Sequence, residues 1–313
     1  MTTPEQSPKQ TERKPDTARL RRWTTYASVG VSSTLILTKL GTYLATDSVA
    51  ILSSLLDSTV DLIASLVTMW GVASALRPPD KEHRFGHGKA EALAALAQAA
   101  FIIGSSVFLS YEALNRLYHP REISHEELGY GVMVFAIVMT LLLLAFQRYT
   151  IRRTNSMAID ADHLHYTGDV GINVAVIVAL GLYQWTGLAW FDPLFAVLIA
   201  GKLILTAWHV AAKALNVLMD RELPDEAREQ IRDLVCRHPS VRGVHDMRTR
   251  SDSDRVFIEM HVEMDGNINL TTAHKVGEDL VDGLRKIHPN ADIMIHQDPA
   301  GIKEDRLDEK LIT

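Results

Sequence analysis

The sequence predicts an α-helical membrane protein with six transmembrane helices and a C-terminal cytoplasmic domain of mixed α and β structure. Three observations support this fold class. Among the 313 residues, 47% are hydrophobic and 22% are charged. The mean hydropathy of +0.03 lies between the values typical of soluble proteins and of fully membrane-embedded ones. Long apolar segments occupy the chain up to about residue 212, and amphipathic helix and strand patterns follow them.

Six segments are apolar over the roughly 20 residues that a helix needs to cross a bilayer. They contain few charged residues. These segments are 23–46, 48–76, 90–114, 129–146, 170–191 and 193–212. A soluble six-helix bundle is the alternative, but its helices would need polar faces, which these segments nearly lack.

The distribution of basic residues predicts that both termini are cytoplasmic. Lys and Arg cluster before the first segment, between the second and third, and between the fourth and fifth. The loops expected on the other side contain few. The positive-inside rule places such clusters in the cytoplasm, and an even number of spans agrees with this topology.

The chain divides into four predicted parts. Residues 1–20 are expected to be a disordered polar tail, 21–215 the transmembrane domain, 216–300 the cytoplasmic domain and 301–313 a second polar tail. The cytoplasmic domain follows the order α-β-β-α-β. Its predicted elements are a helix within 223–238, strands at 241–249 and 256–264, a helix at 271–287 and a strand at 291–296. This is the order of a small α+β, ferredoxin-like (metallochaperone-like) domain.

The composition narrows the possible chemistry. A net charge of −6 argues against a nucleic-acid partner, because phosphate contacts need a basic surface. The chain has a single cysteine, Cys236, which excludes an intramolecular disulfide framework and a thiolate-rich zinc site. It has 13 histidines. Any metal site must therefore use imidazole and carboxylate ligands.

Two pairs of polar residues interrupt the apolar pattern, and an intramembrane carboxylate costs about 2.5–3.5 kcal/mol. Asp57 and Asp61 are four residues apart, and so are His165 and Asp169, so each pair lies on one helix face. Two such helices can form a four-coordinate nitrogen and oxygen site for a divalent first-row ion such as Zn²⁺ or Fe²⁺. The alternative is that the first pair hydrogen-bonds within the bundle or lines a water-filled cavity.

Six motifs follow one another along the chain. They are SSLLDSTVDLIASL, DKEHRFGHGKAEALAALAQA, FQRYTIRRT, ADHLHYTGD, LMDRELPDE and IHQDP. Together they resemble the cation diffusion facilitator family over about residues 23–299. The resemblance implies export of a divalent cation, Zn²⁺ and also Fe²⁺ or Cd²⁺, in exchange for protons by alternating access. It further implies a homodimer in the lipid of the bacterial cytoplasmic (inner) membrane.

The resemblance also implies three metal sites and one charge network. The transport site would comprise Asp57, Asp61, His165 and Asp169, of which His165 and Asp169 would also couple proton movement. A loop site would comprise Asp80, His83 and His87. The cytoplasmic domain would hold Zn²⁺, or Fe²⁺ or Cd²⁺, at the dimer interface through His245, His261, His274, His296 and Asp298. Lys89 and Asp220 would form the interdomain charge network. Without the resemblance, solvated loop and surface histidines are the alternatives.

No catalytic residue is predicted. An intramembrane hydrolase is disfavoured because no HExxH or comparable motif occurs and three carboxylates leave a poor Lewis acid. Two alternatives remain open. One is an exporter of the same family selective for Mn²⁺ or Co²⁺, and the other is a membrane-anchored metal sensor or storage protein. The latter does not account for charged residues inside six apolar segments.

Overall fold

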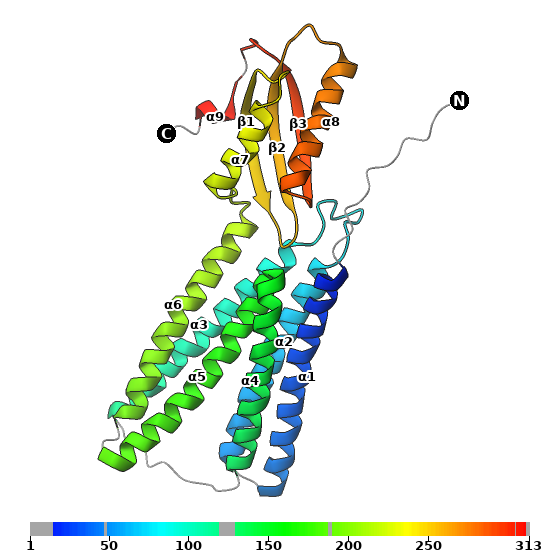
Figure 1. Cartoon of the computed structure of the whole chain (residues 1–313). Helices are drawn as coiled ribbons and strands as arrows, with labels where there is room; N and C mark the ends of the chain where they lie inside the picture. Colours follow the sequence, from blue (N-terminus) through cyan, green and yellow to red (C-terminus); the bar gives the residue numbers. More distant parts are fainter. Residues whose placement is uncertain (1–14, 47–48, 119–128, 187–189, 304, 311–313) are drawn as a thin grey trace. The chain divides into compact units, whose positions relative to one another are not determined.

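The computed structural model describes residues 15–46, 49–118, 129–186, 190–303 and 305–310. The chain separates into two compact units, with the boundary between Leu215 and Asn216. The first is a bundle of long helices and the second contains a three-stranded sheet (Figure 1).

The helical unit contains the long helices labelled α1 to α6 in Figure 1. They are α1 (Pro15–Thr46), α2 (Val49–Ala75), α3 (Lys89–Tyr118), α4 (Gly129–Thr154), α5 (Met157–Thr186) and α6 (Phe191–Leu218). Their lengths run from 26 to 32 residues. At a rise of about 1.5 Å per residue, each exceeds the roughly 30 Å hydrocarbon core of a bilayer.

Four segments among the described residues are long and apolar enough to cross a membrane by length and hydropathy alone. They are Ser54–Ala75, Lys89–Asn115, Val134–Thr154 and Pro193–Leu218. Helices α1 and α5 are equally long, and both contain charged side chains within their length. The prediction of a helical membrane domain is confirmed, whereas six spans go beyond what these criteria support.

Helix α1 begins at Pro15, so residues 15–20, which were predicted to belong to a disordered polar tail, are helical. Proline at the first helical position does not interrupt hydrogen bonding, and Asp16 places a negative charge in the first turn, where the helix dipole favours it. Residues 1–14 lie outside the described part of the chain.

Small side chains allow the helices of the bundle to approach closely. Helix α5 contacts α2, α3 and α4, and α2 contacts both α1 and α3. Where α2 meets α3, a Cβ atom built on Gly71 would lie 2.4 Å from the Cβ of Ala94 and 3.1 Å from the carbonyl oxygen of Ala90. Only glycine fits this contact, which is typical of membrane helix pairs that pack through small residues.

The second unit confirms the predicted α-β-β-α-β order. Its elements are α7 (Asp225–Cys236), β1 (Gly243–Ser251), β2 (Val256–Met264), α8 (Leu270–Ile287), β3 (Ala291–Pro299) and α9 (Leu307–Lys310). The sheet order is β1-β2-β3, in which β2 runs antiparallel to β1 and parallel to β3. Alternate residues of β2, such as Ile258 and Val262, form a buried core with α7 and α8. The side chains between them, including His261, point to the other face of the sheet.

The C-terminal segment, predicted to be a polar tail, contains the short helix α9 and contacts β1. The backbone amides of Asp246 and Asp308 each donate to the other residue's carboxylate, at 2.9 and 3.0 Å. Arg306 also pairs with Glu263 of β2. Burial raises the pKa of Asp246, but the backbone hydrogen bonds from Asp308 and Leu307 outweigh it, so this pKa lies below its ordinary value.

The contact between α2 and α3 gives a test of the bundle packing. Gly71→Ala should destabilise the helical unit by about 1–3 kcal/mol, because the added methyl group overlaps Ala94. Thermal unfolding of the purified chain in detergent measures this loss. Gly30→Ala is the matched control in α1, since nothing lies within 4 Å of its added Cβ. A Gly71→Ala chain as stable as the Gly30→Ala control would contradict the close contact.

Candidate metal centre

Inside the bundle, the predicted pair His165 and Asp169 of α5 lies beside the carboxylate of Asp61 of α2. The Nε2 atom of His165 lies 3.1 Å from Oδ1 of Asp61 and 3.9 Å from Oδ2 of Asp169. One ligand atom from each residue can be chosen so that all lie within 4.8 Å of one another. His165 is only 8% exposed. Two carboxylate oxygens and an imidazole nitrogen at this spacing are suitable ligands for a divalent cation.

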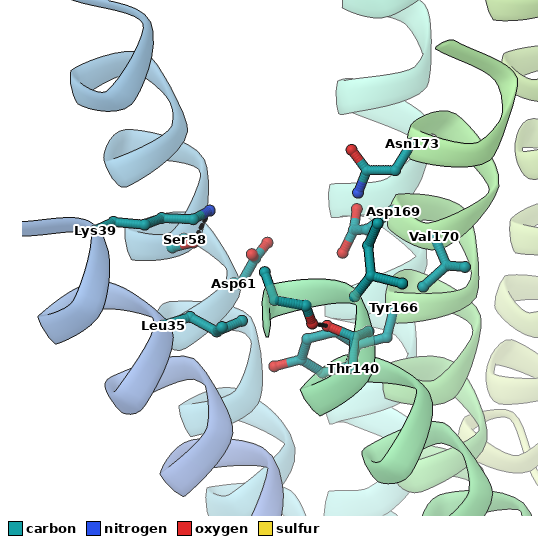
Figure 2. Close-up of a pocket in the computed structure, with 11 residues that line it drawn as sticks. Leu35, Lys39, Ser58, Asp61, Thr140, Tyr166, Asp169, Val170 and Asn173 are labelled. Carbon is teal, nitrogen blue, oxygen red and sulfur yellow. Dashed lines mark hydrogen bonds between the residues drawn. The ribbon is translucent and has the colours of Figure 1, made fainter. Parts of the chain in front are cut away.

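This cluster borders a cavity of about 900 Å³ that is lined mainly by α2, α3 and α5, together with Lys39 of α1 and Leu203 of α6. The cavity extends along α3 from Ala97 to Glu112, towards the end of that helix distant from Lys89. A smaller space of about 70 Å³ adjoins Asp61 and Asp169 on the side of α4. Figure 2 shows both carboxylates pointing into the region between α2 and α5. A hydrated ion can therefore reach the cluster.

Asp57, the fourth predicted ligand, lines the larger cavity one helical turn before Asp61. It does not belong to the group of three whose ligand atoms lie within 4.8 Å. Its carboxylate is on the same face of α2. The structure thus brings three of the four predicted ligands together and places the fourth on the wall of the same cavity.

The sequence did not predict a layer of buried polar residues next to the cluster. Asp162 is 1% exposed and accepts hydrogen bonds from Nε2 of Gln98, at 3.3 Å, and of Gln147, at 2.8 Å. The hydroxyl of Tyr166 lies 2.6 Å from Oγ of Ser32 and 2.8 Å from Oγ of Ser65. Asp162 lies three residues before His165 and four before Tyr166, and this helical spacing was the available signal.

The loop between α2 and α3 brings its three predicted residues together. Nδ1 of His83 and Nε2 of His87 each lie 3.3 Å from a carboxylate oxygen of Asp80. Gly86 adopts a φ of 82°, which returns the chain so that His87 faces Asp80. Backbone amides of His83 and Glu82 donate to Asp80 and hold its pKa below the ordinary value. The carboxylate is therefore ionised at neutral pH and available to a cation.

The sheet of the second unit aligns three of its predicted ligands in one row. His245 of β1 pairs with His261 of β2, which pairs with His296 of β3. Asp298 follows on the same face of β3. Its carboxylate lies 2.8 Å from Nδ1 of His261, 3.1 Å from Nε2 of His296 and 3.5 Å from Nε2 of His245. Asp298 is only 6% exposed, so it forms the centre of this cluster.

His274 is not part of this cluster in the single chain. It is exposed on α8, and α8 covers the opposite face of the sheet from the histidine row. The charge network also stays a prediction, because Lys89 and Asp220 belong to different units. Within the second unit, Asp220 pairs with Arg250 at 3.4 Å.

Comparison with known proteins decides the family. A family model described as the cation efflux transmembrane domain matches residues 25–219, and one described as the cation efflux protein cytoplasmic domain matches residues 223–300. The chain belongs to the cation diffusion facilitator family. It is therefore a multi-pass membrane protein of a transporter family, not an enzyme, and its C-terminal domain is cytoplasmic.

Several curated members of the family are similar over nearly their whole length. The chain is 42% identical to the cation-efflux pump FieF of Serratia proteamaculans over 289 residues, which are 92% of this chain and 96% of that one. It is 43% identical to FieF of Pectobacterium carotovorum over 285 residues, 91% and 95% of the two chains. The resemblance of the motifs to the cation diffusion facilitator family is thus confirmed, with the FieF (YiiP) cation-efflux pumps among the similar members.

A solved structure, the metal-bound C-terminal domain of the CzcD transporter from Thermotoga maritima, matches part of the chain. It is 29% identical, with a TM-score of 0.24, and the match covers 25% of this chain and 93% of that domain.

The geometry of the cytoplasmic cluster predicts the effect of removing its central carboxylate. Asp298→Ala should lower the Zn²⁺ bound by the purified chain by about one ion per chain, because three histidines lose their shared partner. Equilibrium dialysis followed by elemental analysis measures the stoichiometry. Asp292→Ala is the matched control, an exposed carboxylate on the same strand. Equal Zn²⁺ binding by both variants would show that the cluster is not a metal site.

Proposed function

We propose that the protein exports Zn²⁺, and also Fe²⁺ or Cd²⁺, across the bacterial cytoplasmic membrane in exchange for protons. The observation that carries this proposal is the cluster of Asp61, His165 and Asp169 at the inner end of a cavity within the helical unit. Ionisable residues inside a membrane domain are costly and usually serve transport. Membership of the family and the similarity to pumps named for cation efflux support the same function.

The proposed transport site consists of Asp57, Asp61, His165 and Asp169. Carboxylates and imidazole bind first-row divalent ions without the very slow release expected of a thiolate site. Metal binding requires deprotonated ligands, so each ion that binds displaces protons. His165 and Asp169 are the proposed proton carriers, since an unperturbed imidazole titrates near pH ~6.5. Protons entering from the outer side then compete with the metal and favour its release.

A difference between the two ends of the bundle supports the proposed alternating access. The cavity runs from the cluster along α3 to Glu112, near the C-terminal end of that helix, which faces outward if all six helices span the membrane as we propose. At the other end, buried Arg21 pairs with buried Glu91 at 3.1 Å, and Ser156 donates to the same carboxylate at 2.8 Å. Closing the cavity and separating these groups would expose the site to the cytoplasm.

The cytoplasmic domain is the proposed dimer interface and a second place where metal binds. The relevant family model covers residues 223–300, and the cluster of His245, His261, His296 and Asp298 lies on the sheet face that α7 and α8 leave uncovered. A second copy of the chain would cover this face, and His274, which is not part of the cluster in the single chain, is proposed as a ligand from the partner subunit. The loop ligands Asp80, His83 and His87 are proposed as an additional metal site. Lys89 and Asp220 are proposed as the interdomain charge network.

Transport by this site can be tested in proteoliposomes. The combined variant His165→Ala and Asp169→Ala should lower Zn²⁺-dependent proton flux roughly 100-fold or more, because it removes two ligands together with the proposed proton carriers. A pH-sensitive dye inside the vesicles reports the flux. His209→Ala is the control, since His209 is an exposed histidine of α6 whose Nδ1 lies 2.7 Å from the Leu205 carbonyl oxygen of its own helix. Full exchange by the double variant would exclude this site.

The same assay separates the alternative functions. Competition among Zn²⁺, Fe²⁺, Cd²⁺, Co²⁺ and Mn²⁺, with and without a pH gradient, distinguishes the proposed exporter from one selective for Mn²⁺ or Co²⁺. A metal sensor or storage protein would bind metal without any flux. Flux that does not saturate and does not follow the pH gradient would indicate a channel.

The cytoplasmic cluster predicts that metal changes the packing of the dimer. Cys236, the only cysteine, is exposed and accepts a spin label without other changes to the chain. Addition of Zn²⁺ should shift and narrow the distance distribution between the two labels. The double variant His245→Ala and Asp298→Ala should show no shift, because its cluster is lost. Identical distributions with and without Zn²⁺ in the parent chain would contradict this role.

A further inference from the structure

Lys39 is a charged residue inside α1 that no part of the proposed mechanism uses. Its Nζ atom donates hydrogen bonds to the backbone carbonyl oxygen of Ser54, at 3.0 Å, and to Oγ of Ser58, at 2.7 Å. Both acceptors belong to α2 and both are uncharged. Figure 2 shows the side chain extending from α1 to Ser58, on the side of α2 that carries Asp61.

Lys39 lines both of the cavities that adjoin the metal cluster. Lys39 lines the 70 Å³ space together with Asp61 and Asp169, and it lines the 900 Å³ cavity together with these residues and Asp57. Lys39 is half-buried, and an ammonium group inside a membrane domain is costly unless negative charge compensates it. The oxygens of α2 satisfy its hydrogen bonds, and the nearby carboxylates supply the compensating charge without contacting it directly.

We propose that Lys39 is the built-in counter-charge of the transport site and sets its affinity for the cation. This inference rests on the proposed function of that site. With no metal bound, the ammonium offsets the negative charge of the aspartates. A divalent cation that enters the cluster is repelled by Lys39, so the site binds it less tightly and releases it faster.

The charge of Lys39 acts on the site through the cavities that it shares with the aspartates. The Coulomb energy of two charges falls in inverse proportion to their distance, and a divalent cation doubles it. The expected effect on cation affinity is about tenfold. Removing the charge while keeping the hydrogen bonds to Ser54 and Ser58 isolates this effect.

The test compares Lys39→Gln with Lys39→Arg in the full chain. Both are made in a background that lacks the other candidate sites through Asp80→Ala and Asp298→Ala, so that Zn²⁺ binding reports the intramembrane cluster. Lys39→Gln should bind Zn²⁺ at least about tenfold more tightly in a chelator competition assay. Lys39→Arg, which keeps the positive charge, should stay within about twofold of the background. In vesicles, Lys39→Gln should lower both KM and the maximal rate.

The matched control is Lys202→Gln, another lysine within a long apolar helix, which is exposed on α6 and does not line either cavity. Its Zn²⁺ affinity should equal that of the background. Lys39→Met provides a second neutral variant should Lys39→Gln fail to fold, with the same expected direction.

The outcomes separate this inference from the proposed function. Unchanged or weaker Zn²⁺ binding in Lys39→Gln, with loss of binding in Asp61→Asn, overturns the counter-charge role and leaves the transport site standing. Equal tightening in Lys39→Arg and Lys39→Gln also overturns it, because shape rather than charge would then be responsible. Unchanged binding in Lys39→Gln and in Asp61→Asn overturns both.

Discussion

The hydrogen bond between Asp61 of α2 and His165 of α5, at 3.1 Å, is the interaction on which the helical unit depends. A carboxylate between apolar helices is costly unless a partner compensates it. The two residues are 104 positions apart, so their pairing requires α2 and α5 to pack side by side with Asp61 and His165 at the same level along the bundle. The packing of α2 against its other neighbour, α3, depends on small residues, as at Gly71 and Ala94. The polar pair and the small residues thus both fix the position of α2 in the bundle.

The buried polar layer next to the cluster, formed around Asp162 and Tyr166, follows from the same constraint, namely that a polar group between apolar helices needs a partner. Asp162, one turn before His165, is fully enclosed and is satisfied by amide groups from α3 and α4. Tyr166 reaches hydroxyl groups of α1 and α2. Polar groups enclosed between the helices need hydrogen-bond partners where water does not reach them. These bonds tie four helices to α5 and hold His165 in a defined position, which metal selectivity requires.

In the cytoplasmic unit, the corresponding constraint is strand register. A shift of one residue between β2 and its neighbours would move His261 to the helix-covered face and break the row with His245 and His296. The apolar residues of β2 prevent that shift, because Ile258 and Val262 must face α7 and α8. The hydrophobic core therefore aligns the metal ligands without contacting them.

The sequence by itself determined the helical membrane domain, the α-β-β-α-β order and the residue types of every candidate site, because hydropathy and helical or strand periodicity are local properties. Spacing identified the pairs Asp57 with Asp61 and His165 with Asp169. Local patterns carry no information about which distant segments meet. Only the tertiary structure placed Asp57 on the cavity wall rather than in the cluster, put His274 on the helix layer away from the histidine row, and brought Lys39 opposite the aspartates. Helix packing and sheet register decide those positions. Each depends on the whole buried surface rather than on residues that are neighbours in the sequence.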